Sequence, residues 1–167
     1  PTAAPTAVPP TDVPAPTDVP TEEPGLKIDP SGQTVIFWHV WGSGSAAEGI
    51  AAIVADFNAT NEWGITVEAI DQGNQGDLQN AVNAAITTGE LPNVTPGFPN
   101  AIATWYGAGA IAELNTFIDD PKFGLTADEF AALYPANLAS GRLAGGTQIG
   151  MPIHQSANVL FYNHSWA

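Results

Sequence analysis

The chain has 167 residues, with three basic and seventeen acidic side chains and a formal net charge of −14. This length suffices for one domain with a buried core, and the acidic balance makes nucleic acid and anionic membrane surfaces poor partners. The sequence contains no cysteine, which excludes a disulfide scaffold, a thiolate nucleophile and a cysteine-based metal site within it. No apolar run approaches the roughly 20 residues that a membrane-spanning helix needs.

Residues 1–30 differ in composition from the rest of the chain. They hold nine of the fifteen prolines, and the run from Pro10 to Pro14 recurs from Pro16 to Pro20. Because proline lacks an amide hydrogen and this segment has little apolar surface to bury, we expect a disordered, semi-rigid linker. It is either a tether that holds a domain away from a surface or a plain disordered tail. Pro/Thr-rich spacers are common on exported proteins, which favours the tether.

The globular part, residues 31–167, opens with a strand, a turn and a helix. The apolar run 35–38 is rich in β-branched and aromatic residues and predicts a buried strand. Ser45 and Glu48 have the spacing of a capping box, which predicts that a helix begins there. The helical spacing of the following apolar residues predicts a buried face made of Ile50, Ile53, Val54 and Phe57.

A second strand and a second helix follow in the same order. Residues 65–70 alternate as a strand does, Asp77 is expected to cap the helix, and Gly89 is expected to end it. Residues 91–98 predict a third strand, which Pro96 should keep short. This βαβαβ order predicts an α/β fold with a mostly parallel sheet, right-handed crossovers and flanking helices. The buried face of the second helix is expected to hold Leu78, Val82, Ala85 and Ile86.

Shorter elements are predicted in the remainder of the chain. Asn100 is expected to cap a brief helix. Thr126 and Glu129 repeat the capping-box spacing, and Pro135 should kink or split the helix that they open. Three further segments complete the prediction: a short buried element over residues 111–117, a turn at Gly145 and Gly146, and a strand over residues 158–162.

The turn after the first strand matches a dinucleotide-binding pattern. Residues 42–47 fit G-x-G-x-x-A, and the helix N-terminus behind them would offer amides to a pyrophosphate. Asp71 lies near the place of a ribose-binding acid. Residues 39–41 are bulky where a dinucleotide must pass close, which favours a plain strand-to-helix turn. An NAD(P)-dependent oxidoreductase that uses Gly42 and Gly44 is nevertheless the alternative to be tested.

Other catalytic and metal-binding patterns are weak or absent from the sequence. It has no G-x-S-x-G elbow, no H-E-x-x-H helix and no Gly-Lys-Ser phosphate loop. The three histidines are scattered, so a metal site would require the fold to gather them. Asp119 and Asp120 precede a proline, a position more typical of a turn than of a catalytic pair. We therefore predict no catalytic residue, no metal and no cofactor.

Side chains suited to a sugar follow the ends of the predicted strands. Because the carboxyl ends of parallel strands meet at one edge of a sheet, we expect these loops to lie together. Amide groups offer a donor and an acceptor to sugar hydroxyls, and aromatic rings match the apolar C–H face of a pyranose. The candidates are Trp41 after the first strand, Gln72 and Asn74 after the second, Phe98 and Asn100 after the third, and His154, Gln155 and Ser156 near the end of the chain.

Five sequence segments occur here in the order seen in a known family. They are FWHVWG at 37–42, FNATNEWGITVEAI at 57–70, AAITTGELPNV at 84–94, GAIAEL at 109–114 and GMPIHQSANVLFYNHSWA at 150–167. With them the chain resembles, over about residues 33–167, extracellular solute-binding proteins of carbohydrate ABC importers, the maltose- and glycerol-phosphate-binding type.

The resemblance implies two α/β lobes of the type II periplasmic-binding-protein kind that close over a ligand. This chain would then be most of the N-terminal lobe, with the second lobe missing, and would bind sugar weakly or not at all alone. Trp41 and Ser43 would lie in the first ligand loop. Asn100 would occupy a polar ligand position, and Ser156, with its two predecessors, would reach toward the hinge.

The resemblance also implies a function and a location. The ligand would be a mono- or oligosaccharide, the partner would be the membrane permease of an ABC importer, and the protein would act as a monomer. It would work on the extracellular or periplasmic face, held by a lipid anchor upstream of the linker. Besides the oxidoreductase, the alternative is a surface adhesion module that uses the linker as its stalk.

Overall fold

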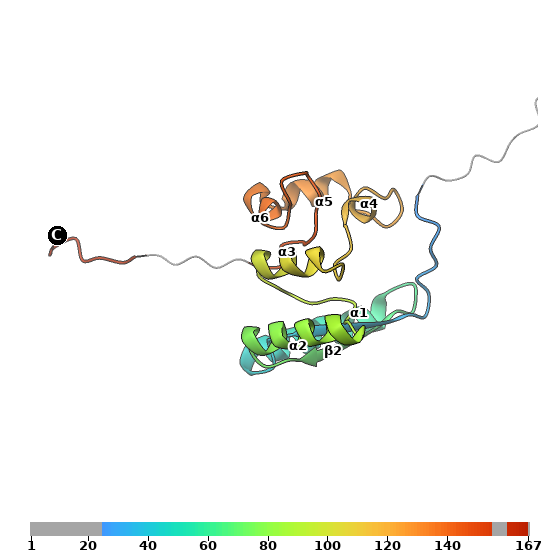
Figure 1. Ribbon diagram of the computed structural model, residues 1–167, viewed down its shortest axis with the longest axis horizontal. Helices are drawn as coiled ribbons and strands as arrows, with labels where there is room; N and C mark the ends of the chain where they lie inside the picture. Colours follow the sequence, from blue (N-terminus) through green and yellow to red (C-terminus); the bar gives the residue numbers. More distant parts are fainter. Residues whose placement is uncertain (1–24, 155–159, 167) are drawn as a thin grey trace, which may run out of the picture.

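The computed structural model of the protein describes residues 25–154 and 160–166. Figure 1 shows the strands grouped with α1 and α2, a second group made of α4, α5 and α6, and α3 between the two groups. Of the expected linker, residues 1–24 lie outside the described residues. The elements are β1 (Thr34–His39), α1 (Gly44–Thr60), β2 (Thr66–Asp71), α2 (Gln75–Thr88), α3 (Pro99–Gly107), α4 (Asn115–Ile118), α5 (Ala127–Ala132) and α6 (Pro135–Ser140).

The two regular strands confirm the start of the predicted parallel sheet. β1 and β2 pair in parallel, with Thr34 opposite Thr66 and His39 opposite Asp71. Both strands therefore end at the same edge, and the loop that follows each strand starts from this edge.

The predicted third strand over residues 91–98 is reduced to one bridge. Phe37 of β1 pairs in parallel with Val94, and the Trp38 amide donates to the Val94 carbonyl at 3.0 Å. In a parallel ladder the next donor on the neighbouring segment would be residue 96. Because Pro96 has no amide hydrogen, the ladder stops there, as predicted, and the pairing is shorter still than the expected short strand, a single bridge.

The core lies between β1, α2 and α3. Leu78 and Val82 of α2 pack with Ala101 and Trp105 of α3, and the β1 side of this cluster includes Trp38. The apolar face predicted for the second helix is therefore confirmed, with Leu78, Val82 and Ala85 buried and Ile86 partly buried. The indole Nε1–H of Trp105 donates to Asn83 Oδ1 at 2.9 Å, which satisfies its buried polar group.

α1 lacks the buried face that its periodicity predicts. No residue of α1 is buried, and Ile53 is 67% exposed. The helix is joined to β2 by polar contacts instead, because the Asn58 side chain accepts from the Val67 amide at 2.7 Å and donates to the Val67 carbonyl at 3.0 Å. Asn58 thus occupies hydrogen-bonding positions that a further strand would otherwise take on β2.

The helix ends correct three predicted caps and confirm three others. α1 begins behind Ser43 rather than Ser45, and α3 begins behind Phe98 rather than Asn100. α2 is capped by Asn74 rather than Asp77. The confirmed features are the left-handed Gly89 at the end of α2, the capping box of Thr126 and Glu129, and the split at Pro135, which begins α6.

The segment before β1 is tied to the turn after α4. The buried carboxylate of Asp120 accepts from the amides of Leu26, Lys122 and Phe123. These donors, led by the Phe123 amide, hold the pKa of Asp120 below its usual range. The turn interpretation of this acidic pair is therefore confirmed, and contacts with the folded part begin before residue 31.

The last predicted elements have mixed outcomes. Ile111 packs against the core, but no residue of the following helix α4 is buried and Phe117 is exposed, so the buried element predicted over residues 111–117 is wrong for its second half. The turn at Gly145 and Gly146 is confirmed by an antiparallel bridge between Arg142 and Gln148. Residues 160–162 are not a strand, which corrects the prediction for that part of 158–162, and residues 158 and 159 lie outside the described residues.

Candidate functional site

The loops after β1 and β2 meet at the carboxyl edge of the sheet. The Gln72 amide, directly after β2, donates to the carbonyl of His39 at 2.8 Å. In the other loop, Gly42 lies so close to the Asp71 carboxylate that an added Cβ would collide with it. The two loops are therefore held side by side. We call this edge of the sheet the rim, and it includes Trp41, Ser43, Gln72, Asn74, Phe98, Asn100 and His154.

The third loop reaches the same edge from the other side of β1. The parallel bridge at Val94 makes the chain run in the direction of β1 up to the start of α3. Phe98 follows and is 57% exposed, and Asn100 is exposed in the first turn of α3. The fold thus directs all three predicted loops to one edge of the sheet.

The chain returns to the rim near its end. The ring of His154 meets the ring of Trp41 edge-on, with 5.8 Å between the centroids. This contact brings His154 to the rim, although it is far from Trp41 in the sequence. Gln155 and Ser156 lie outside the described residues.

The polar side chains of the rim differ in whether they already make hydrogen bonds within the protein. Within the described part of the chain, the side chains of Ser43, Gln72 and Asn100 make no hydrogen bond. Asn74 differs, because its Oδ1 accepts from the amides of Gly76 and Asp77 at the start of α2. Asn74 therefore has a structural task here that the sequence prediction assigned to Asp77.

Sequence reasoning assigned no task at the rim to His39 and weighed Asp71 only as a ribose ligand. His39 is 6% exposed, its Nδ1 accepts from the Trp41 amide at 3.2 Å, and Asp71 Oδ1 lies 3.9 Å away from the same nitrogen. The signal was present in the alternation of β1, since Phe37, His39 and Trp41 are two residues apart and fall on one face.

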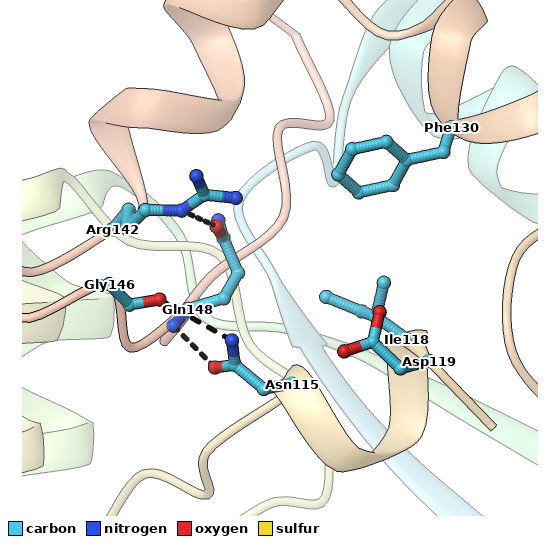
Figure 2. Close-up of a pocket in the computed structure, with 7 residues that line it drawn as sticks. All are labelled: Asn115, Ile118, Asp119, Phe130, Arg142, Gly146 and Gln148. Carbon is cyan, nitrogen blue, oxygen red and sulfur yellow. Dashed lines mark hydrogen bonds between the residues drawn. The ribbon is translucent and has the colours of Figure 1, made fainter. Parts of the chain in front are cut away.

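A hollow of about 200 Å³ lies apart from the rim, between α4, α5 and the turn at Gly145 and Gly146. Figure 2 shows Arg142 and Phe130 on opposite sides of it. Asn115 accepts from the Gln148 amide at 2.8 Å, and Arg142 Nε donates to Gln148 Oε1 at 3.0 Å. These hydrogen bonds connect the turn to α4. These polar groups of the hollow therefore hold neighbouring segments together and are not free to bind a ligand.

Two further shifted pKa values belong to contacts outside the rim. A hydrogen bond to the carboxylate of Glu113 raises the pKa of the Tyr106 phenol. The hydroxyl and amide of Thr126 lower the pKa of Glu129, in the capping box of α5. In both cases the shift follows from a structural hydrogen bond.

Neither a metal cluster nor a membrane helix is found in residues 25–154 and 160–166. No group of three or more His, Asp and Glu side chains there is arranged to hold a metal ion. No helix in the same residues is long and apolar enough to cross a membrane.

Comparison with known proteins places the chain in a family. Residues 52–167, more than half of the sequence, match the family described as bacterial extracellular solute-binding protein. The chain belongs to this family. Its members bind solutes and are not enzymes, so the oxidoreductase alternative built on Gly42 and Gly44 is wrong, and those glycines serve the strand-to-helix turn. No curated protein matches the chain significantly.

Solved structures of similar fold support the architecture of this solute-binding protein. The chain is 23% identical to a cyclic alpha-maltosyl-1,6-maltose binding protein from Arthrobacter globiformis, covering 68% of this chain and 26% of that one at a TM-score of 0.55. An extracellular solute-binding protein from Alicyclobacillus acidocaldarius is 18% identical, with 75% and 27% covered and a TM-score of 0.55. CpMnBP1 with mannobiose bound is 15% identical, with 71% and 29% covered and a TM-score of 0.56.

These likenesses establish the fold as a lobe of the periplasmic-binding-protein type, an α/β architecture with a small parallel sheet and flanking helices. The chain spans about a quarter of the length of the solved structures that it matches.

Proposed function

We propose that this solute-binding protein captures a mono- or oligosaccharide at the rim and delivers it to the permease of an ABC importer. The observation that carries the proposal is that three loops start from one edge of the sheet, with the His154 ring packed on Trp41 in the first of them. Two of the similar structures, by name, bind a maltosyl-maltose and mannobiose, which supports a carbohydrate as the solute.

The chemistry of the rim suits a neutral, hydroxyl-rich ligand. The indole face of Trp41 would cover the C–H face of a pyranose, and the unused amides of Gln72 and Asn100 would exchange hydrogen bonds with its hydroxyls. Ser43, Phe98, Gln155 and Ser156 are the further ligand contacts in this proposal.

Closure of a second lobe over the bound sugar would supply the rest of the affinity. A ligand shifts a protein toward its closed state only by the difference in its affinity for the two states. One lobe alone offers half of the contacts, so we expect this chain to bind sugar in the millimolar range or weaker. We further propose that it acts as a monomer on the extracellular or periplasmic face, where residues 1–30 tether it to a lipid anchor in the membrane.

The location of binding is tested by nuclear magnetic resonance. Maltose and mannobiose are titrated separately into the ¹⁵N-labelled chain, and the shifts of all amide and indole signals are followed. We expect the shifted signals to cluster at Trp41, Gln72, Asn100 and His154. Shifts that cluster instead at the hollow beside Arg142, or no shifts with any sugar of a broad panel, would contradict the proposal.

A further inference from the structure

His39 is a buried imidazole behind the proposed sugar-binding surface. It ends β1, is 6% exposed, and lies on the same strand face as Phe37, whose ring centroid is 5.4 Å from its own. A buried polar side chain is costly unless it is hydrogen-bonded. Its contacts therefore indicate what it does in the fold.

The ring nitrogen Nδ1 binds the first residue of the loop. The Trp41 amide donates to Nδ1 at 3.2 Å, and a nitrogen that accepts a hydrogen bond cannot carry a proton. In this geometry Nδ1 is the acceptor, so the ring proton lies on Nε2. Asp71 Oδ1, 3.9 Å from Nδ1, is too far away for a hydrogen bond.

The same residue fixes the neighbouring ring and the neighbouring loop. The rings of His39 and Trp41 are nearly parallel, at 14°, with 6.3 Å between centroids. The His154 ring also packs on Trp41, edge-on. The His39 carbonyl also accepts from the Gln72 amide. His39 thus contacts two of the three loops that the sugar is proposed to touch.

We propose that His39 is a positioning residue for sugar binding: its unprotonated Nδ1 holds the Trp41 amide and so orients the indole before the ligand arrives. This inference rests on the proposed function. A ring that is already ordered loses less conformational entropy when a sugar stacks on it, which raises affinity without adding a contact.

Two substitutions separate the acceptor from the ring. His39→Phe keeps an aromatic ring of similar size but removes the acceptor. His39→Asn removes the ring but places Oδ1, an acceptor, at the same position along the side chain as Nδ1. We expect hydrogen exchange of the Trp41 amide to become about fivefold faster in His39→Phe and to stay near the wild-type rate in His39→Asn. Affinity for the sugar that binds the wild-type chain should fall by a similar factor only in His39→Phe.

Both variants need to be folded for this comparison, and methyl signals of Leu78 and Val82 in the core report on that. Equal losses of Trp41 protection in the two variants would assign the effect to packing of the ring and overturn the inference. The wild-type chain gives an independent test, because ¹⁵N shifts of the imidazole distinguish its tautomers. The tautomer with its proton on Nε2 is expected, and a proton on Nδ1 would overturn the inference without any variant.

The exchange and tautomer measurements need no sugar. If the Trp41 amide depends on the His39 acceptor as expected but no sugar shifts any signal of the chain, the proposed function fails while the contact stands. If a sugar binds at Trp41 with equal affinity in the wild type and His39→Phe, the positioning inference fails and the proposed function stands.

Discussion

α1 and α2 each follow a strand of the same parallel pair, yet they are attached to the protein in different ways. α2 buries Leu78 and Val82 against α3, whereas α1 buries no residue and is joined to β2 by the Asn58 side chain. Both helices have apolar residues at helical spacing. The comparison shows that spacing identifies the apolar face of a helix but not whether anything covers it.

The largest expected difference in stability is between substitutions on the apolar face of α2 and on that of α1. Leu78→Ala should lower the free energy of unfolding by about 2–5 kcal/mol, because it removes a fully buried side chain and leaves a cavity. Ile53→Ala is the matched control on α1 and should change it by less than about 0.5 kcal/mol, since that side chain is mostly exposed. Urea unfolding measures both. Equal losses would mean that the apolar face of α1 is covered after all.

The polar attachment of α1 should have the next largest effect. Asn58→Ala removes both hydrogen bonds to Val67 and should cost about 1–2 kcal/mol. We also expect faster hydrogen exchange at the Val67 amide, while amides of α2 keep their protection. Asn83→Ala is no control, because Asn83 bonds Trp105, but Asn80→Ala on the exposed side of α2 is suitable and should change neither quantity. Unchanged exchange at Val67 in Asn58→Ala would contradict the polar attachment.

A smaller difference in stability is expected between the N-cap residues of α2 and α1. The Asn74 side chain accepts two amides of α2, whereas the Ser43 side chain accepts none from α1. Asn74→Ala should therefore cost about 1 kcal/mol, and Ser43→Ala only a few tenths. Thermal unfolding followed by circular dichroism measures the two losses. A larger loss from Ser43→Ala would reverse the assignment of the caps.

Acid should release the segment before β1 while it leaves both helices folded. The pKa of Asp120 is lowered in the folded chain, so its contribution to stability is present above the ordinary carboxyl pKa of 3.8 and is lost as the pH falls below that value toward the folded pKa. Amide shifts of Leu26 and Phe123 should change in this range, ahead of the signals from α2. Asp120→Asn should weaken the contact at every pH.

Much of the sheet side of the fold could be predicted from sequence because local patterns decide it. The apolar run of β1, the alternation of β2 and the apolar face of α2 were found directly. Pro96 was expected to shorten the third strand, and its missing amide hydrogen reduces the pairing to a single bridge. Whether another segment covers the apolar face of α1 could not be predicted, since this depends on segments distant in sequence. The predicted caps were two or three residues away from the observed ones, because Asn, Ser and Asp can each cap a helix and only the chain's path selects the residue that does.

The rim was predicted in its loops but not in what holds them. That the loops after β1 and β2 lie together follows from parallel pairing, which the sequence order implies. His39 was missed because the alternation of β1 places it on the same face as Trp41 but does not indicate which group it bonds. The partner, the Trp41 amide, is a backbone group and leaves no mark in the sequence.

The central claim is that a sugar is held against the Trp41 indole. Saturation-transfer NMR detects weak binding and reports which ligand protons touch the protein. Maltose or mannobiose should receive saturation at the C–H protons of one pyranose face from the wild-type chain. The signal should persist in Trp166→Ala, a matched loss of a highly exposed tryptophan, and disappear in Trp41→Ala. Equal saturation in Trp41→Ala and Trp166→Ala would contradict the account.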